Sequence, residues 1–66
     1  MNLRIMSNSG DVTEYDEYDV DATEMESVYM EFLRGEPVIQ LIYKDGSKSA
    51  INSKFVAAIH LESEED

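Results

Sequence analysis

The sequence predicts an α+β fold, in which one helix packs on an antiparallel sheet of four to five strands in the order ββαβββ. Three observations support this: one stretch with apolar residues at helical spacing, several short β-prone runs around it, and turns containing Gly, Asn and Asp between the runs. The chain has 66 residues, enough for one hydrophobic core. We expect a single domain over residues 1–61 and an acidic tail over residues 62–66, whose composition predicts disorder.

The helix is the best defined element and is expected over residues 21–35. Its apolar residues fall on one face: Ala22, Met25, Val28, Tyr29, Phe32 and Leu33. Asp21 is a favourable N-cap, and Glu24 follows three residues later, as in a capping box. Gly35 suits the position just after a helix, and Pro37 prevents its continuation.

The segment before the helix predicts a β-hairpin. Leu3 and Ile5 alternate with less apolar residues in the first arm, and residues 7–11 have turn chemistry. The second arm is expected over residues 12–20. Its alternation is irregular, which indicates a bulge near Tyr15 and Asp16.

The segment after the helix predicts three further strands. An apolar run over residues 38–43 is followed by Asp45-Gly46, a pair that provides the positive φ of a hairpin turn. Residues 48–52 form the return strand. Residues 55–61 fit either a buried strand or a helical stripe capped by Ser53, and we favour the strand.

The apolar run over residues 38–43 raises a packing problem. It presents Ile39, Leu41 and Tyr43 to one face of the sheet and Val38 and Ile42 to the other. A single helix covers one face, so we expect an exposed apolar patch on the second face, together with Met6 and part of residues 56–61. A homodimer that buries this patch is the expected assembly.

Acidic side chains outnumber basic ones by 15 to 5, and the net charge is −10. Residues 1–33 carry nine acids and one base, whereas residues 34–61 carry four bases and two acids. Because binding to phosphates requires clusters of Lys and Arg, we expect no direct nucleic-acid partner and no membrane partner. A basic protein surface is the expected partner. The alternative is that the acids only keep the protein soluble.

The sequence contains no pattern typical of catalysis or metal binding. Cysteine is absent and His60 is the single histidine, which excludes disulfides and most zinc sites. The acids at 16–21 lack the glycine and glutamate of an EF-hand loop, and the isolated glycines form no phosphate-binding loop. We expect a protein that is not an enzyme and has no cofactor. With no secretion signal and no apolar run of membrane-spanning length, the expected location is cytoplasmic.

Residues 11–21 contain the leading candidate for a partner-binding site, because two tyrosines alternate there with carboxylates. The candidate residues are Glu14, Tyr15, Asp16, Glu17, Tyr18 and Asp19. Tyrosine is enriched where proteins meet, and carboxylates attract a basic partner and pair with its Arg or Lys. The alternative interpretation is an edge strand that charge protects against aggregation.

The second candidate is a ligand-binding set in the modestly basic half of the chain. It comprises Arg34, Tyr43, Lys44, Lys48 and Lys54. If these side chains converged at an interface between subunits, with Arg4, they could hold a nucleotide-like anion. The alternative interpretation is that they are solvated strand residues.

The carboxyl-terminal half resembles a pattern of short acidic phage and prophage proteins of Gram-positive bacteria. Residues 39–47, 50–52 and 56–59 carry the resemblance: a strand, an Asp-Gly turn, a strand ending in Ile-Asn, and a final strand. It implies a β-meander and a host-takeover factor or an inhibitor of bacterial defence. That group includes DNA mimics and scavengers of signalling nucleotides. The resemblance assigns no role to any residue.

These observations lead to two functional hypotheses. The first is a phage-type inhibitor, not an enzyme, that occupies a basic site on a host or defence protein through its acidic, tyrosine-bearing surface, in the host cytoplasm. The second is an oligomeric sponge that sequesters a nucleotide-like signalling molecule. They differ in one requirement: the sponge needs its basic residues gathered in a pocket.

Overall fold

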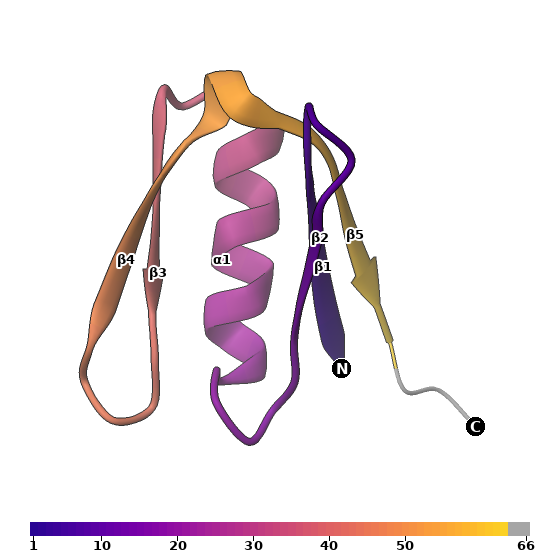
Figure 1. Cartoon of the computed structure of the whole chain (residues 1–66). Helices are drawn as coiled ribbons and strands as arrows, with labels where there is room; N and C mark the ends of the chain where they lie inside the picture. The colour runs from indigo at the N-terminus through magenta and orange to yellow at the C-terminus, as the bar shows by residue number, and fades with distance from the viewer. Residues whose placement is uncertain (64–66) are drawn as a thin grey trace.

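A computed structural model of the chain describes residues 1–63 and confirms the predicted α+β fold in the order ββαβββ (Figure 1). All strand pairs are antiparallel. The elements within the described residues are β1 (Asn2–Ser7), β2 (Val12–Tyr15), α1 (Ala22–Leu33), β3 (Val38–Ile42), β4 (Lys48–Asn52), a 3-10 turn η1 (Ser53–Phe55) and β5 (Val56–Glu62). The last segment is therefore a strand, as favoured, and it extends one residue past the expected domain boundary. Of the expected tail, residues 64–66 lie outside the described residues.

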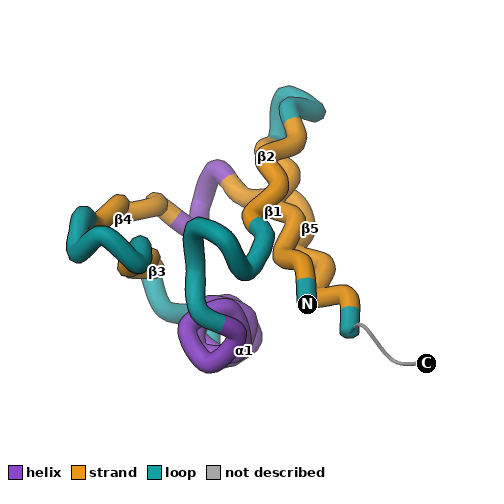
Figure 2. The backbone as a smooth tube through the Cα atoms, turned by 90° about the horizontal axis from the view of Figure 1, so that it is seen from below, coloured by secondary structure: helices purple, strands orange, loops and turns teal. Residues whose placement is uncertain are grey.

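The strands form two sheets where the sequence suggested one. β1 pairs with both β2 and β5 in a sheet of order β2-β1-β5, and β3 pairs with β4 in a separate sheet. The two sheets face each other, and α1 closes one side of the space between them (Figure 2). The split arises at η1, where the Asn52 side chain accepts a hydrogen bond from the Lys54 amide and the chain crosses to β1.

Both hairpins turn through three residues that end in glycine. The Ser7 amide donates to the Asp11 carbonyl at 2.8 Å, and the Tyr43 amide donates to the Ser47 carbonyl at the same distance. Gly10 has a φ of 94° and Gly46 one of 91°. The positive φ predicted for the Asp-Gly turn is thus confirmed, and this loop type with a glycine bulge is common in hairpins.

The second arm of the first hairpin is shorter than expected. β2 ends at Tyr15, and the Asp16 carbonyl accepts from the amides of Asp19 and Val20 at 3.1 Å each. The predicted bulge near Tyr15 and Asp16 is therefore wrong, because pairing stops there. An irregularity in register does occur between β1 and β5, next to Met6.

The helix ends as predicted but starts differently. Gly35 has a φ of 76°, its amide donates to Phe32, and the next amide donates to Glu31, which is a Schellman motif. Asp21 makes no side-chain capping bond, and the predicted capping box is wrong because the Glu24 carboxylate accepts its hydrogen bond from an amide outside the helix. That carboxylate accepts a hydrogen bond from the Ile42 amide at 3.0 Å.

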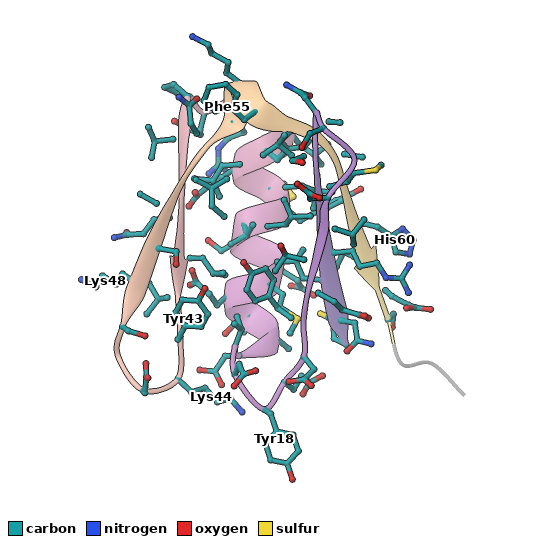
Figure 3. All side chains as sticks on the ribbon, viewed as in Figure 1. Tyr18, Tyr43, Lys44, Lys48, Phe55 and His60 are labelled. Carbon is teal, nitrogen blue, oxygen red and sulfur yellow. The ribbon has the colours of Figure 1, made fainter. Side chains whose placement is uncertain are left out.

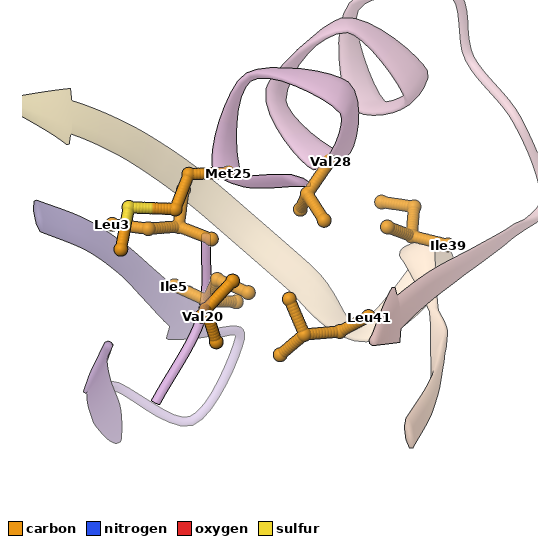
Figure 4. Close-up of a cluster of buried hydrophobic side chains, with 7 residues drawn as sticks. All are labelled: Leu3, Ile5, Val20, Met25, Val28, Ile39 and Leu41. Atoms are coloured by element: carbon orange, nitrogen blue, oxygen red, sulfur yellow. The ribbon is translucent and has the colours of Figure 1, made fainter. Parts of the chain in front are cut away.

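The core lies between the two sheets and the helix (Figure 4). Its buried side chains are Leu3, Ile5, Val20, Met25, Val28, Ile39 and Leu41. Burying such a side chain stabilises the fold by about 1.5–3 kcal/mol. Leu33, predicted in the helix stripe, is 60% exposed. It is the last helical residue, and its position on the helix turns it away from Met25 and Val28.

The predicted alternation of the apolar run is confirmed, but the single apolar patch is wrong. Ile39 and Leu41 are buried, whereas Val38 and Ile42 are exposed on the outer face of β3. Met6 and residues 56–61 belong to the other sheet. The exposed apolar side chains are therefore divided between two outer faces.

Candidate functional site

Four of the six predicted partner-binding residues surround one hollow at the end of the molecule where β2 runs toward α1. The hollow has a volume of about 580 Å³, and we call it the acidic hollow. It is lined by Met1, Asn2, Glu14, Asp16, Glu17 and Tyr18. A side chain entering it would therefore meet three carboxylates and one aromatic ring.

Tyr18 stands at the tip of the turn that borders the acidic hollow (Figure 3). Its side chain is 91% exposed. The turn is held by the Asp16 carboxylate, which accepts a hydrogen bond from the Tyr18 amide at 3.0 Å, and by the buried Val20 after it. The exposed ring is thus carried on a backbone that local hydrogen bonds and a core contact fix in place.

Two carboxylates of the acidic hollow already have positively charged neighbours. The Glu17 carboxylate lies 2.6 Å from the Met1 nitrogen, and this hydrogen bond lowers the pKa of Glu17, with a further contribution from nearby positive charge. Glu14 lies 3.6 Å from Arg4, which also lies 3.5 Å from Glu62. All of these contacts are solvent-exposed, so they remain open to exchange for a partner's basic groups.

Tyr15 does not join the other candidates. Its half-buried ring points between the sheets, with its centroid 6.1 Å from that of Tyr43. Burial first, and then a hydrogen bond with Tyr43, raise the pKa of Tyr15 to about 12. The Tyr43 hydroxyl also lies 3.1 Å from that of Ser49. Tyr15 therefore links the two sheets and is not a contact residue of the acidic hollow.

Asp19 lies on the other side of Tyr18. A second hollow of about 340 Å³ is lined there by Tyr18, Asp19, Tyr43, Lys44, Asp45 and Ser47. The Asp19 carbonyl accepts a hydrogen bond from the Lys44 amide at 2.8 Å, which ties the turn to the second hairpin. Tyr18 is therefore flanked by carboxylates in two directions.

The alternative ligand-binding set is divided between the two ends of the molecule. Tyr43, Lys44 and Lys48 lie toward the end that carries Tyr18 (Figure 3). Lys44 is 3.8 Å from the Asp21 carboxylate. At the opposite end, Lys54 stacks over Phe55 at 6.0 Å, and Arg34, at the carboxyl end of α1, pairs with Glu36 at 3.7 Å. The five residues form no common pocket within one protomer.

A cleft between the two sheets was missed by sequence reasoning. It has a volume of about 350 Å³ and lies between the β1–β2 hairpin and β4. Apolar groups of Ile5, Tyr15, Ile51, Phe55 and Val56 line it, with Ser7, Ser9, Asp11, Thr13 and Asn52 as its polar members. No local pattern could have shown it, because it exists only where the predicted single sheet divides in two.

Within residues 1–63, no cluster of His, Asp and Glu side chains is arranged to hold a metal ion. His60 is exposed on the outer face of the three-stranded sheet, where it shares a hollow of about 220 Å³ with Arg4, Met6, Val12 and Ala58. The helix in this part of the chain is neither long nor apolar enough to cross a membrane.

Comparison of the chain with protein-family models, with curated proteins and with solved structures found no match.

Proposed function

We propose that this protein is a binding protein, not an enzyme, that occupies a basic site on another protein through Tyr18 and the carboxylates around it. The observation that carries the proposal is the 91% exposed Tyr18 ring on a hydrogen-bonded turn between the acidic hollow and the second hollow, which contains Asp19. By blocking that site, the protein acts as an inhibitor. In the phage-type setting that the sequence suggests, the target is a host or defence protein in the cytoplasm.

The exposed ring is suited to anchoring a complex. A tyrosine offers a large contact area with only two side-chain torsions to fix, so its immobilisation costs little entropy. The Asp16 hydrogen bond already fixes the backbone beneath it. Binding then requires less ordering than a flexible loop would.

The surrounding charge determines which partner is attracted. Asp16, Glu17 and Asp19 lie within four residues of one another, in a chain of net charge −10. Their mutual repulsion is relieved when Arg or Lys side chains of a partner approach, and the same field accelerates encounter with a basic surface. Added salt screens this attraction.

The sponge hypothesis receives no support from the geometry of one protomer. Arg34 and Lys54 lie at the end of the molecule opposite Lys44 and Lys48, and Lys44 is already close to Asp21. Calorimetry with cyclic and ADP-ribose-type nucleotides tests this alternative directly. We expect no heat of binding.

The proposal is tested by identifying a partner in a host-cell lysate and then measuring the affinity of the purified pair. We expect a basic partner whose affinity falls at least tenfold between about 50 and 300 mM salt. Tyr18→Ala should weaken binding by a factor of 10 or more, whereas Tyr18→Phe keeps most of the contact area. Asp16→Asn with Glu17→Gln removes two charges and retains groups that can accept the same hydrogen bonds.

The matched control removes two charges elsewhere. Glu26→Gln with Glu36→Gln gives the same net charge as the Asp16 and Glu17 double variant, at exposed positions that line neither of the two hollows beside Tyr18. We expect a weaker complex only for the pair near Tyr18. Equal losses of affinity for both double variants would show that only the net charge matters. An unchanged affinity for Tyr18→Ala would refute the proposed contact.

A further inference from the structure

The cleft between the sheets lies between two strand edges. β2 is an outer strand of the three-stranded sheet, and β4 is an outer strand of the two-stranded sheet. Both lie on the side of the molecule away from α1 (Figure 2). The cleft, with apolar Ile5, Ile51 and Val56, runs between them. Edge strands carry backbone donors and acceptors that have no partner within the sheet.

The turn geometry shows which groups of β2 point outward. The Ser7 amide donates to the Asp11 carbonyl, so residues 7 and 11 form a hydrogen-bonded pair. In antiparallel strands such pairs alternate with non-hydrogen-bonded ones. Residues 13 and 15 therefore bond to β1 in the observed register, and the backbone groups of Val12 and Glu14 point away from the sheet.

The same alternation can be derived for β4, and two hydrogen bonds on its partner strand β3 agree with it. The pair Tyr43 and Ser47 sets the alternation, so Lys48 and Ala50 point their backbone groups outward from β4. On β3 the same alternation directs the amides of Gln40 and Ile42 away from β4. Those two amides are indeed bonded to helix carboxylates, Glu31 at 3.3 Å and Glu24 at 3.0 Å. Thus α1 caps the β3 edge and leaves the β4 edge available for pairing.

We infer that an extended segment of the partner protein inserts between β2 and β4 and pairs with both edges. This inference rests on the proposed function and names the part of the partner that is recognised. The inserted strand joins the two sheets through Glu14 and Ala50, a mode of recognition known as β-augmentation. Alternate apolar side chains of the segment enter the cleft, since side chains on a strand alternate between two faces.

The chemistry of the segment follows from the charges around the cleft. Its inward side chains are apolar, to match Ile5, Ile51 and Phe55. Its outward side chains are basic where they lie beside β2, because Glu14 belongs there to the acidic hollow and not to the cleft, and the chain is strongly acidic. Lysine and valine at alternate positions satisfy both requirements.

The cleft and the acidic hollow belong to one continuous surface. β2 contributes Thr13 and Tyr15 to the cleft and Glu14 to the acidic hollow. A segment that leaves the cleft past Tyr15 therefore reaches Asp16 and Tyr18. The strand pairing fixes the position of the partner chain, and the hollow receives the basic residue that follows.

The experiment uses two synthetic probes with the full chain. One is a six-residue peptide of alternating valine and lysine, and the other has the same sequence with a methyl group on every second backbone nitrogen. Both carry the same charge, but the methylated peptide cannot pair with one of the edges. We expect at least tenfold tighter binding of the unmethylated peptide, with slower hydrogen exchange at the amides of Glu14 and Ala50.

A variant of the protein tests the β4 edge. Ala50→Pro removes an outward amide without removing a β3–β4 hydrogen bond, and Ala50→Val keeps that amide. We expect tenfold weaker binding of the unmethylated peptide to the proline variant only. The comparison of the two peptides uses the unsubstituted protein, so it remains decisive if the proline variant does not fold.

Each contrary result has a distinct meaning. Equal, salt-sensitive binding of both peptides, with changes confined to residues 14–19, overturns the strand insertion and leaves the proposed function standing. Binding of the unmethylated peptide that is insensitive to salt contradicts the basic character of the partner, and with it the proposed function. Exchange protection of Ala50 that rises with protein concentration, without peptide, assigns the edge to a second copy of the chain and overturns the inference.

Discussion

The two hairpins are built alike and end up in different surroundings. Each turns through three residues with a glycine at positive φ, and each closes with a hydrogen bond of 2.8 Å. The β1–β2 hairpin gains a third strand, β5, whereas the β3–β4 hairpin has Glu24 and Glu31 of the helix along its edge. The local sequence thus determines the turn. The elements packed beside each hairpin determine which groups form hydrogen bonds with the backbone at its edges.

Substitutions at two neighbouring residues of β3 should show the largest difference in their effect on the free energy of unfolding. Leu41 is buried and Ile42 is 38% exposed. Leu41→Ala should lower the free energy of unfolding by about 2–5 kcal/mol through lost burial and a residual cavity, and Ile42→Ala by less than about 1 kcal/mol. Urea denaturation measures both. Similar losses for the two variants would contradict the observed orientation of β3.

The helix carboxylates provide the next test. Glu24→Ala removes the acceptor of the Ile42 amide at the β3 edge, so we expect a loss of about 1–2 kcal/mol. Glu26→Ala, on the exposed side of the same helix, should change stability by less than about 0.5 kcal/mol. Faster hydrogen exchange at the Ile42 amide in the Glu24 variant would confirm the cause. An equal effect of the two variants would show that the edge contact contributes nothing.

The equivalence of the turns can be tested at their glycines. Gly10→Ala and Gly46→Ala both force a side chain into positive φ, while the added Cβ meets no atom within 4 Å in either turn. We expect each to cost about 1 kcal/mol, from backbone strain alone. Thermal unfolding of the two variants should give matching shifts. A clear difference between them would mean that the two hairpins are not alike even locally.

The last effect depends on pH and concerns the contact between the hairpins at Tyr15. Burial and the bond with Tyr43 raise the pKa of Tyr15 to about 12 in the folded protein, from 10.0. The neutral hydroxyl is favoured by folding, so its contribution is fully present below pH 10 and is lost as the pH rises from 10 to 12. Tyr15→Phe should flatten this part of the stability profile. Urea denaturation at a series of pH values across this range measures the profiles of both proteins.

Much of the fold could be predicted because its signals are local. The positive φ of Gly35 and the turn at Gly46 follow from residues within a few positions, and the alternation of Ile39 and Ile42 follows from strand geometry. The predicted capping box was wrong because a distant group competed for Glu24. The Ile42 amide lies 18 residues away along the chain.

The candidate site was predictable in part for the same reason. The acids and Tyr18 lie close together in the sequence, so a single turn gathers them. Tyr15 also has acidic neighbours in the sequence, but its side chain points inward. It is still in β2, and its partner Tyr43 belongs to the other hairpin. The alternation of side chains along β2 could not reveal this difference, because the sequence did not show that β2 ends at Tyr15.

The sequence by itself determined the order of elements, the turns, the helix end and the acidic composition of one end, because each depends on contacts between residues near one another in the chain. Only the tertiary structure decided that β5 pairs with β1, that the sheet divides in two, and that a cleft lies between β2 and β4. Strand partners are chosen by burial of side chains far apart in sequence, and no local pattern encodes that choice.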